Sequence, residues 1–220
     1  MERCPEPELM DDDAQARAYA AADFAEPHNR FVSLLRQHLP DLPPAGVALD
    51  LGCGPADVTI RVARALPQWQ IDGLDGSAAM LRYGHAAIAR AGLADRVRLA
   101  QVRLPAVAFP RPAYDLVFSN SLLHHLGDPA VLWQSVRRAA PPGAAVFVMD
   151  LMRPGSRDAA ARLVDVYCAG EPEVLRRDFF NSLLAAYRED DVRHQLRAAE
   201  LGHLTVAAAS DRHLIVWGRV

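Results

Sequence analysis

Short apolar runs alternate with amphipathic helical segments between residues 45 and 150, and this alternation restricts the fold more than any other feature of the chain. The runs are almost continuously apolar and cover 47–51, 69–74, 97–102, 114–119 and 144–149. Strands of this kind are buried on both faces, which is typical of parallel sheets covered by helices. The helical segments lie between the runs, over 58–66, 77–90 and 129–140. The pattern predicts an α/β fold of the Rossmann-like, doubly wound type.

Further segments flank this alternating region. Residues 9–39 are predicted to be helical in two pieces, with Asp11, Asp12 and Asp13 before an alanine-rich stretch. Prolines after residue 39 place a boundary near residue 45. Only helices, about three, are predicted over 153–200, and 204–209 with 213–219 read as a terminal hairpin that completes seven strands. We therefore expect an N-terminal helical lid over 1–44 and a domain over 45–220, in which the helical insertion 153–200 forms a substrate wall.

Composition excludes several classes of site. All 24 basic residues are arginine, so a Schiff-base lysine and a lysine-containing phosphate loop are both excluded. The net charge of −3 provides no global field for nucleic acid. The cysteines Cys4, Cys53 and Cys168 are odd in number and lack C-x-x-C spacing, so we expect neither a disulfide framework nor a thiolate zinc site, and we name no metal ligand.

Hydropathy predicts no membrane association. No apolar stretch approaches the roughly 18 to 20 residues that a membrane helix needs. The segment Met1 to Glu6 is acidic and contains Pro5, so it does not resemble a signal peptide. We expect a soluble, cytoplasmic protein.

A glycine-containing loop follows the first predicted strand. In an open α/β sheet ligands bind outside the carboxyl ends of the strands, and Gly52 and Gly54 allow the backbone to turn tightly there. A dinucleotide fingerprint would need a third glycine where Asp57 stands, and a carboxylate at a helix N-terminus repels a pyrophosphate. Asp50, at the end of the strand, favours a cationic ligand instead.

A second acidic residue, Asp75, ends the next predicted strand 25 residues later. Its carboxylate can accept hydrogen bonds from both hydroxyls of a ribose, and Gly76 leaves room for the sugar. The plain alternative is that Asp75 is an ordinary helix N-cap.

Three segments together carry a resemblance to a known family. They are Asp50-Leu51-Gly52-Cys53-Gly54, the stretch 73–81 around Asp75, and 114–126, which ends in Leu122-Leu123-His124-His125-Leu126. In this order and spacing they resemble the class I S-adenosylmethionine-dependent methyltransferases that act on small molecules. The resemblance covers about 45–150 and the terminal hairpin, which is similar to the reversed last strand of that family's mostly parallel sheet.

The resemblance implies a set of cofactor contacts. S-adenosylmethionine would be the methyl donor and S-adenosylhomocysteine the product. Gly52, Cys53 and Gly54 would cradle its methionine part, with Asp50 near the ammonium, while Asp75 and Gly76 would take the ribose. Ser77 and Met80 would lie beside the adenine, and Asn120 and Ser121 would approach the methionine and the departing methyl group.

One position departs from the family pattern. Many relatives place an aspartate where this chain has Arg103, which cannot accept a hydrogen bond from the adenine amino group. We expect Arg103 either to stack on the adenine or to point away, which would leave the backbone near Leu104 to read the base.

Histidines are the candidates for acid–base chemistry. His125 or His124 is positioned by the motif to deprotonate an acceptor, since histidine titrates near neutral pH. The alternatives are that this pair caps a helix, or that alignment and desolvation suffice without a base. In the lid, Tyr19 and Phe24 would cover the sulfonium and His28 would reach the substrate, unless this helix only packs on the sheet edge.

We therefore expect methyl transfer to a small-molecule O, N, S or C nucleophile, without nucleic acid or membrane partners, and leave a homodimer open. The alternatives are a non-methylating enzyme that uses the same cofactor and a non-catalytic cofactor-binding partner protein. A nicotinamide dehydrogenase lacks its fingerprint, and an arsenite methyltransferase lacks its cysteine pairs.

Overall fold

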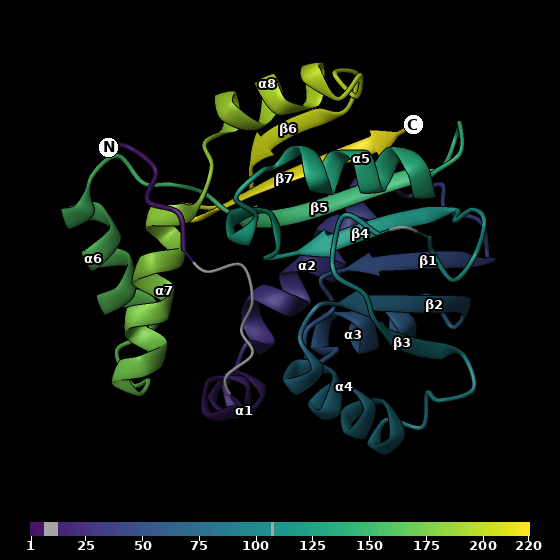
Figure 1. Cartoon of the computed structure of the whole chain (residues 1–220), viewed down its shortest axis with the longest axis horizontal. Helices are drawn as coiled ribbons and strands as arrows, with labels where there is room; N and C mark the ends of the chain where they lie inside the picture. Colours follow the sequence, from purple (N-terminus) through teal and green to yellow (C-terminus); the bar gives the residue numbers. More distant parts are fainter. Residues whose placement is uncertain (7–12, 107) are drawn as a thin grey trace.

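The computed structural model describes residues 1–6, 13–106 and 108–220 and contains a seven-stranded sheet in the order β3-β2-β1-β4-β5-β7-β6 (Figure 1). The strands are β1 (Ala45–Leu51), β2 (Gln68–Asp75), β3 (Val97–Gln101), β4 (Leu116–Asn120), β5 (Ala145–Leu151), β6 (Thr205–Ala208) and β7 (His213–Arg219). The pairs from β3 to β5 are parallel, whereas β7 is antiparallel to both β5 and β6. The predicted mostly parallel sheet with a reversed last strand is confirmed.

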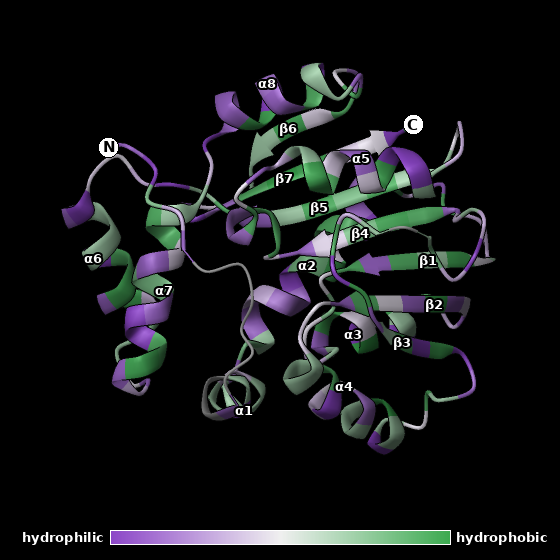
Figure 2. Cartoon of the chain, viewed as in Figure 1, coloured by the Kyte–Doolittle hydropathy of each residue, from purple (hydrophilic) through white to green (hydrophobic). Residues whose placement is uncertain are grey.

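Helices cover both faces of the sheet, which explains the continuous apolar runs. Alternate residues of β1 enter different clusters: Leu49 and Leu51 pack with α5 (Ala130–Ala139) and α8 (Glu189–Ala198). Ala48 packs instead with α2 (Ala25–His38), α3 (Asp57–Ala65) and α4 (Ala78–Arg90). Figure 2 shows hydrophobic residues along β1, β4 and β5. A strand between two helical layers has no polar face, which is why these strands read as nearly continuous apolar runs.

The N-terminal helices have different environments. In α1 (Asp13–Ala21), Ala16 packs on Ala79 and Met80 of α4. In α2, the fully buried Phe31 packs edge-on against Phe147 of β5, with ring centroids 5.0 Å apart. Helix α2 is therefore part of the sheet's covering layer, and the lid predicted over 1–44 stays a prediction. Asp11 and Asp12 lie outside the described residues.

The predicted helical region 153–200 contains α6 (Arg157–Tyr167), α7 (Glu173–Ala185) and α8. Helices α6 and α7 pack on each other and on Leu151, the last residue of β5. Figure 1 shows them with α1 beyond the carboxyl ends of β1 and β4. Among the described residues, no helix is long and apolar enough to cross a membrane.

The core position of α2 yields a stability prediction. Because Phe31 is fully buried against the sheet, Phe31→Ala should lower the free energy of unfolding by about 3–5 kcal/mol, the range for large-to-small aromatic substitutions. Urea denaturation followed by circular dichroism measures this loss. Val166→Ala, at a side chain that is 68% exposed, serves as the control and should stay within about 0.5 kcal/mol of the parent. A loss below 1 kcal/mol for Phe31→Ala would show that α2 does not belong to the core.

Candidate functional site

A cavity of ≈ 340 Å³ lies at the carboxyl ends of β1, β2 and β4. Its wall combines the α1–α2 region, the loop after β1, the end of β2, the residues after β3 and the end of β4. The site residues predicted from the sequence that line it are Tyr19, His28, Asp50, Gly52, Cys53, Gly54, Asp75, Gly76, Ser77, Met80, Arg103, Leu104, Asn120, Ser121 and His125. Folding therefore brings together residues that are up to about half of the chain apart.

The loop after β1 forms the floor of the cavity. Gly52 has φ +75°, and its amide donates to the carbonyl of Leu74 at 2.8 Å. A Cβ at Gly52 would lie 2.9 Å from Leu122, whereas one at Gly54 (φ +51°) would meet no atom within 4 Å. Both glycines have backbone conformations that other residues adopt at a cost, and Gly54 leaves open space where a ligand can approach the main chain.

Asp75 fastens this loop to β2. Its Oδ2 accepts a hydrogen bond from the amide of Gly54 and its Oδ1 accepts one from the amide of Ser77, both at 2.8 Å. The N-cap of α4 is Ser77, whose Oγ accepts from the amide of Met80 at 3.1 Å. The alternative that Asp75 is the N-cap is therefore wrong. A carboxylate has about four acceptor sites, so a fixed Asp75 can still accept from a ligand's hydroxyls.

Asp50 lies beneath the loop and is only 2% exposed. Thr59 donates a hydrogen bond to its Oδ2 at 2.6 Å. Burial raises the pKa of Asp50 to about 7 and the charge of Asp75 adds to this, against the opposing effect of the Thr59 hydrogen bond. Near neutral pH this carboxyl therefore exchanges its proton, and a cationic ligand beside it would favour the ionised form.

The α1–α2 region contributes an aromatic and basic wall. The ring centroids of Tyr19 and Phe24 lie 4.7 Å apart, and that of the buried His28 lies 5.4 Å from Phe24. The Nδ1 of His28 is 2.6 Å from Oδ2 of Asp57, which also accepts from Nε of Arg61 at 2.9 Å. Although burial alone would raise it, the hydrogen bonds from His28 and Arg61 lower the pKa of Asp57 to about 2. Asp57 is thus an ionised anchor for His28.

The end of β4 carries two signs of a ligand site. The Oδ1 of Asn120 is buried without a hydrogen-bond partner in the described structure, while its Nδ2 donates to Oγ of Ser121 at 3.1 Å. Ser121 has φ +55°, a left-handed conformation that is rare for a residue with a side chain. An unpaired buried acceptor and a strained backbone commonly mark functional sites.

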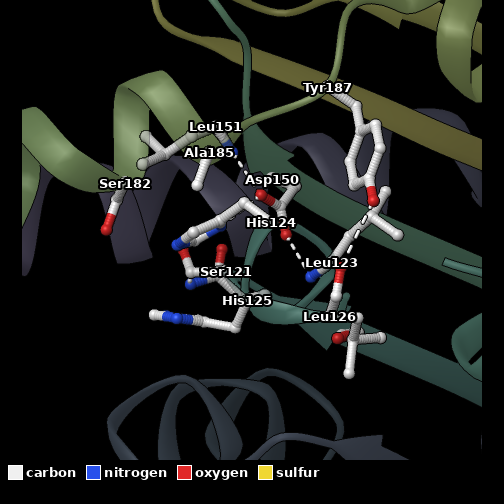
Figure 3. A network of polar contacts seen from close by, with 12 residues as sticks. Ser121, Leu123, His124, His125, Leu126, Asp150, Leu151, Ser182, Ala185 and Tyr187 are labelled. Atoms are coloured by element: carbon white, nitrogen blue, oxygen red, sulfur yellow. Dashed lines mark hydrogen bonds and ion pairs between the residues drawn. The ribbon is translucent and has the colours of Figure 1, made fainter. Parts of the chain in front are cut away.

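The two neighbouring histidines of the short 3₁₀ helix η1 (Leu123–His125) have different surroundings (Figure 3). His124 is 2% exposed, and its Nδ1 lies 2.6 Å from Oδ1 of the buried Asp150, whose Oδ2 accepts from the amide of Leu123. Although burial alone would lower it, Asp150 raises the pKa of His124. His124 is absent from the cavity lining, which includes His125. His124 therefore holds η1 on β5, His125 lines the cavity, and a catalytic role for either histidine stays a prediction.

Sequence reasoning missed several lining residues, namely Asp23, Asp57, Arg61, Arg90 and Leu122. A signal existed only for Asp57 and Arg61, which are four residues apart on one helix and form an ion pair. No described residue of 153–200 is among the lining, so the substrate wall assigned to that region remains a prediction.

The central part of the chain is similar to known methyltransferases. A family model described as "Methyltransferase domain" matches residues 49–146. A trans-aconitate 2-methyltransferase of Azoarcus sp. (strain BH72) is 33% identical over 125 residues, which are 57% of this chain and 46% of that protein. The chain thus spans about half the length of that curated relative.

Solved structures show the same fold. An S-adenosyl-L-methionine-dependent methyltransferase of Methanococcus maripaludis, itself described as putative, superposes with a TM-score of 0.68 at 18% identity, covering 99% of this chain and 97% of that one. The plantazolicin methyltransferase BpumL, in complex with SAH, superposes with a TM-score of 0.69 at 12% identity, over 93% and 88% of the two chains.

The raised pKa of Asp50 predicts a pH effect on stability. Since the folded state holds this proton more tightly than the unfolded chain, the residue destabilises the fold increasingly as the pH rises from about 4 to 7. Asp50→Asn removes this effect, so its stability relative to the parent should rise over that range. The rise should reach roughly 2–4 kcal/mol, since one pKa unit corresponds to about 1.4 kcal/mol.

Urea denaturation of both proteins between pH 4.5 and 8 measures the difference. Asp95→Asn, at an exposed residue of the loop before β3, is the matched control and should show a constant difference. A constant difference for Asp50→Asn as well would contradict the raised pKa.

Proposed function

Since this chain carries a class I S-adenosylmethionine-dependent methyltransferase domain, we propose that its cavity binds S-adenosylmethionine and that the enzyme transfers the methyl group to a small molecule. When bound, this cofactor supplies a methyl group that is activated by a cationic sulfonium. The single observation that carries the assignment is the joint placement of Asp50 and Asp75 on one cavity, at the ends of β1 and β2.

The donors and acceptors of the cavity fit the cofactor's chemistry. Asp50, once ionised, is a partner for the ammonium of the methionine part, and Asp75 accepts from the ribose hydroxyls. The open space at Gly54 admits the chain of the methionine part against the backbone. The unpaired Oδ1 of Asn120 provides an acceptor toward the methyl end. Ser77, Met80, Arg103 and Leu104 complete the adenine end.

The α1–α2 wall keeps water away from the reacting atoms. Tyr19, Phe24 and His28 line the cavity and contact one another through their rings. Exclusion of water and alignment of the acceptor with the methyl group provide most of the acceleration that such a transfer needs. His28, held by Asp57, orients groups at the mouth of the cavity, and His125 accepts the proton that the acceptor gives up.

The acceptor that we propose is small. The cavity measures ≈ 340 Å³, and the net charge of −3 provides no basic field for a nucleic acid. Two of the similar proteins are named for trans-aconitate and plantazolicin, and neither name is that of a nucleic acid. These names support a small-molecule acceptor and leave the methylated atom undefined.

Calorimetry tests the cofactor assignment. Asp75→Ala should weaken the binding of both S-adenosylmethionine and S-adenosylhomocysteine by about 100-fold or more, because it removes hydrogen bonds to a charged acceptor worth about 1.5–3 kcal/mol each. It also removes the acceptor for the amide of Gly54. The exposed Asp95→Ala is the matched control and should bind like the parent. Absence of binding by the parent protein, or a preference for NAD, would refute the proposal.

Turnover with methyl-labelled cofactor tests the reaction. A panel of carboxylic acids, phenols, amines and thiols, with trans-aconitate included, should yield a labelled product with at least one acceptor. With that acceptor, His125→Ala should lower kcat by about 10²–10⁴-fold, the usual contribution of general base catalysis. Cofactor binding without any labelled product would instead favour a non-catalytic role, and unchanged turnover by His125→Ala would remove the base.

A further inference from the structure

Glu6 lies against the histidine pair although 117 residues separate it from η1. Its Oε1 is 3.1 Å from Nδ1 of His125 and 3.6 Å from Nε2 of His124. The Glu6 side chain is 13% exposed, and its Oε1 also accepts a hydrogen bond from Oγ of Ser182 at 2.9 Å. Although burial alone would raise it, His125 and His124 lower the pKa of Glu6 below its usual range. A half-buried carboxylate therefore faces one nitrogen of the cavity-lining histidine.

Residues 1–6 are here called the N-terminal strap. Arg3 attaches this strap to the core and so keeps Glu6 beside the histidines. Arg3 donates to the carbonyls of His124 at 2.9 Å, Leu126 at 3.0 Å and Ala185 at 2.5 Å. Its guanidinium lies 4.2 Å from the ring centroid of Tyr187, and the hydroxyl of Tyr187 donates in turn to the carbonyl of Leu126 (Figure 3). The strap is thus attached to the same turn that carries His125, so the position of the carboxylate relative to the imidazole is fixed.

A carboxylate beside one imidazole nitrogen determines the tautomer. When Nδ1 faces a carboxylate, the proton resides on Nδ1 and Nε2 keeps a free lone pair, which is the form that a general base needs. The present contact between Glu6 and Nδ1 of His125 lacks hydrogen-bond alignment, and such contacts in ligand-free sites often tighten only when the ligand is bound. Asp150 faces Nδ1 of His124 in the same way, but the ring of His124 lies outside the cavity lining and its Nε2 faces Glu6, so His124 does not present a free nitrogen to the cavity.

We propose that Glu6 is a positioning residue that holds His125 in the Nδ1-protonated tautomer, so that Nε2 accepts the proton leaving the methyl acceptor. That proton passes from Nε2 to solvent when the product leaves. The proton transfer rests on the proposed function, whereas the tautomer does not. The N-terminal strap is then part of the active site rather than a structural extension of the lid.

Nitrogen-15 NMR of protein labelled in histidine tests the tautomer without an acceptor. At pH 8 the parent protein should show His125 protonated at Nδ1 and unprotonated at Nε2. Glu6→Ala should move the proton to Nε2, the form that free imidazole side chains prefer in water. Glu2→Ala, at an exposed residue of the same strap, is the matched control and should leave the tautomer unchanged. The parent spectrum is decisive even if Glu6→Ala fails to fold.

Three results would overturn the proposal. The first is a parent protein with His125 protonated at Nε2, and the second is a Glu6→Ala variant with the parent's tautomer. The third is stoichiometric binding of Zn²⁺, titrated as zinc sulfate, that shifts both histidine spectra, because ligand atoms of Glu6, His124 and His125 lie within 4.8 Å of one another and would then form a metal site. Calorimetry should show that Glu6→Ala binds S-adenosylmethionine as the parent does. Absence of binding by the parent would refute the proposed function, whereas the NMR result alone decides the role of Glu6.

Discussion

Burial of both faces of the parallel sheet is the constraint on which the rest of the structure depends. Leu49 and Leu51 point into one helical layer and Ala48 into the other, so both faces of the strand are taken up by apolar packing along most of its length. Strand β1 pairs with β2 on one side and β4 on the other. The crossovers leave in opposite directions at this point, and the crevice they open at the carboxyl ends of the strands is where ligands bind in such sheets. The cavity lies there because of the topology.

Charge is distributed unevenly around this cavity. Asp57 is paired with His28 and Arg61. Among the described residues, Asp50 has the Thr59 hydroxyl as its one side-chain hydrogen-bond partner, and it lies close enough to Asp75 for that charge to raise its pKa. Ionising Asp50 therefore costs free energy, because the carboxylate would be buried and close to the charge of Asp75. A cationic ligand lowers that cost, whereas a pyrophosphate would increase it. The same electrostatics that disfavour a dinucleotide thus favour a sulfonium with an ammonium group.

The sequence was sufficient where function depends on contiguous segments. The alternation of apolar runs predicts the order of strands and helices because both faces of each strand are buried. The family resemblance, drawn from the segments around Asp50, Asp75 and Asn120, is confirmed. The sequence could not show that His125 lines the cavity and His124 does not. This difference depends on Asp150, which lies 26 residues from His124 and contacts its ring. It also could not predict Glu6, because no periodicity connects residues 1–6 with η1.

Two histidine–carboxylate contacts involve residues of the cavity lining, and each joins a residue from the first part of the chain to the core domain. His28 of α2 reaches Asp57 of α3, and Glu6 of the strap reaches His125 of η1. The family match covers residues 49–146, so it includes Asp57 and His125 but neither His28 nor Glu6. The part of the cavity that the family model covers is therefore completed by groups from residues 1–6 and 13–38, which lie outside that match.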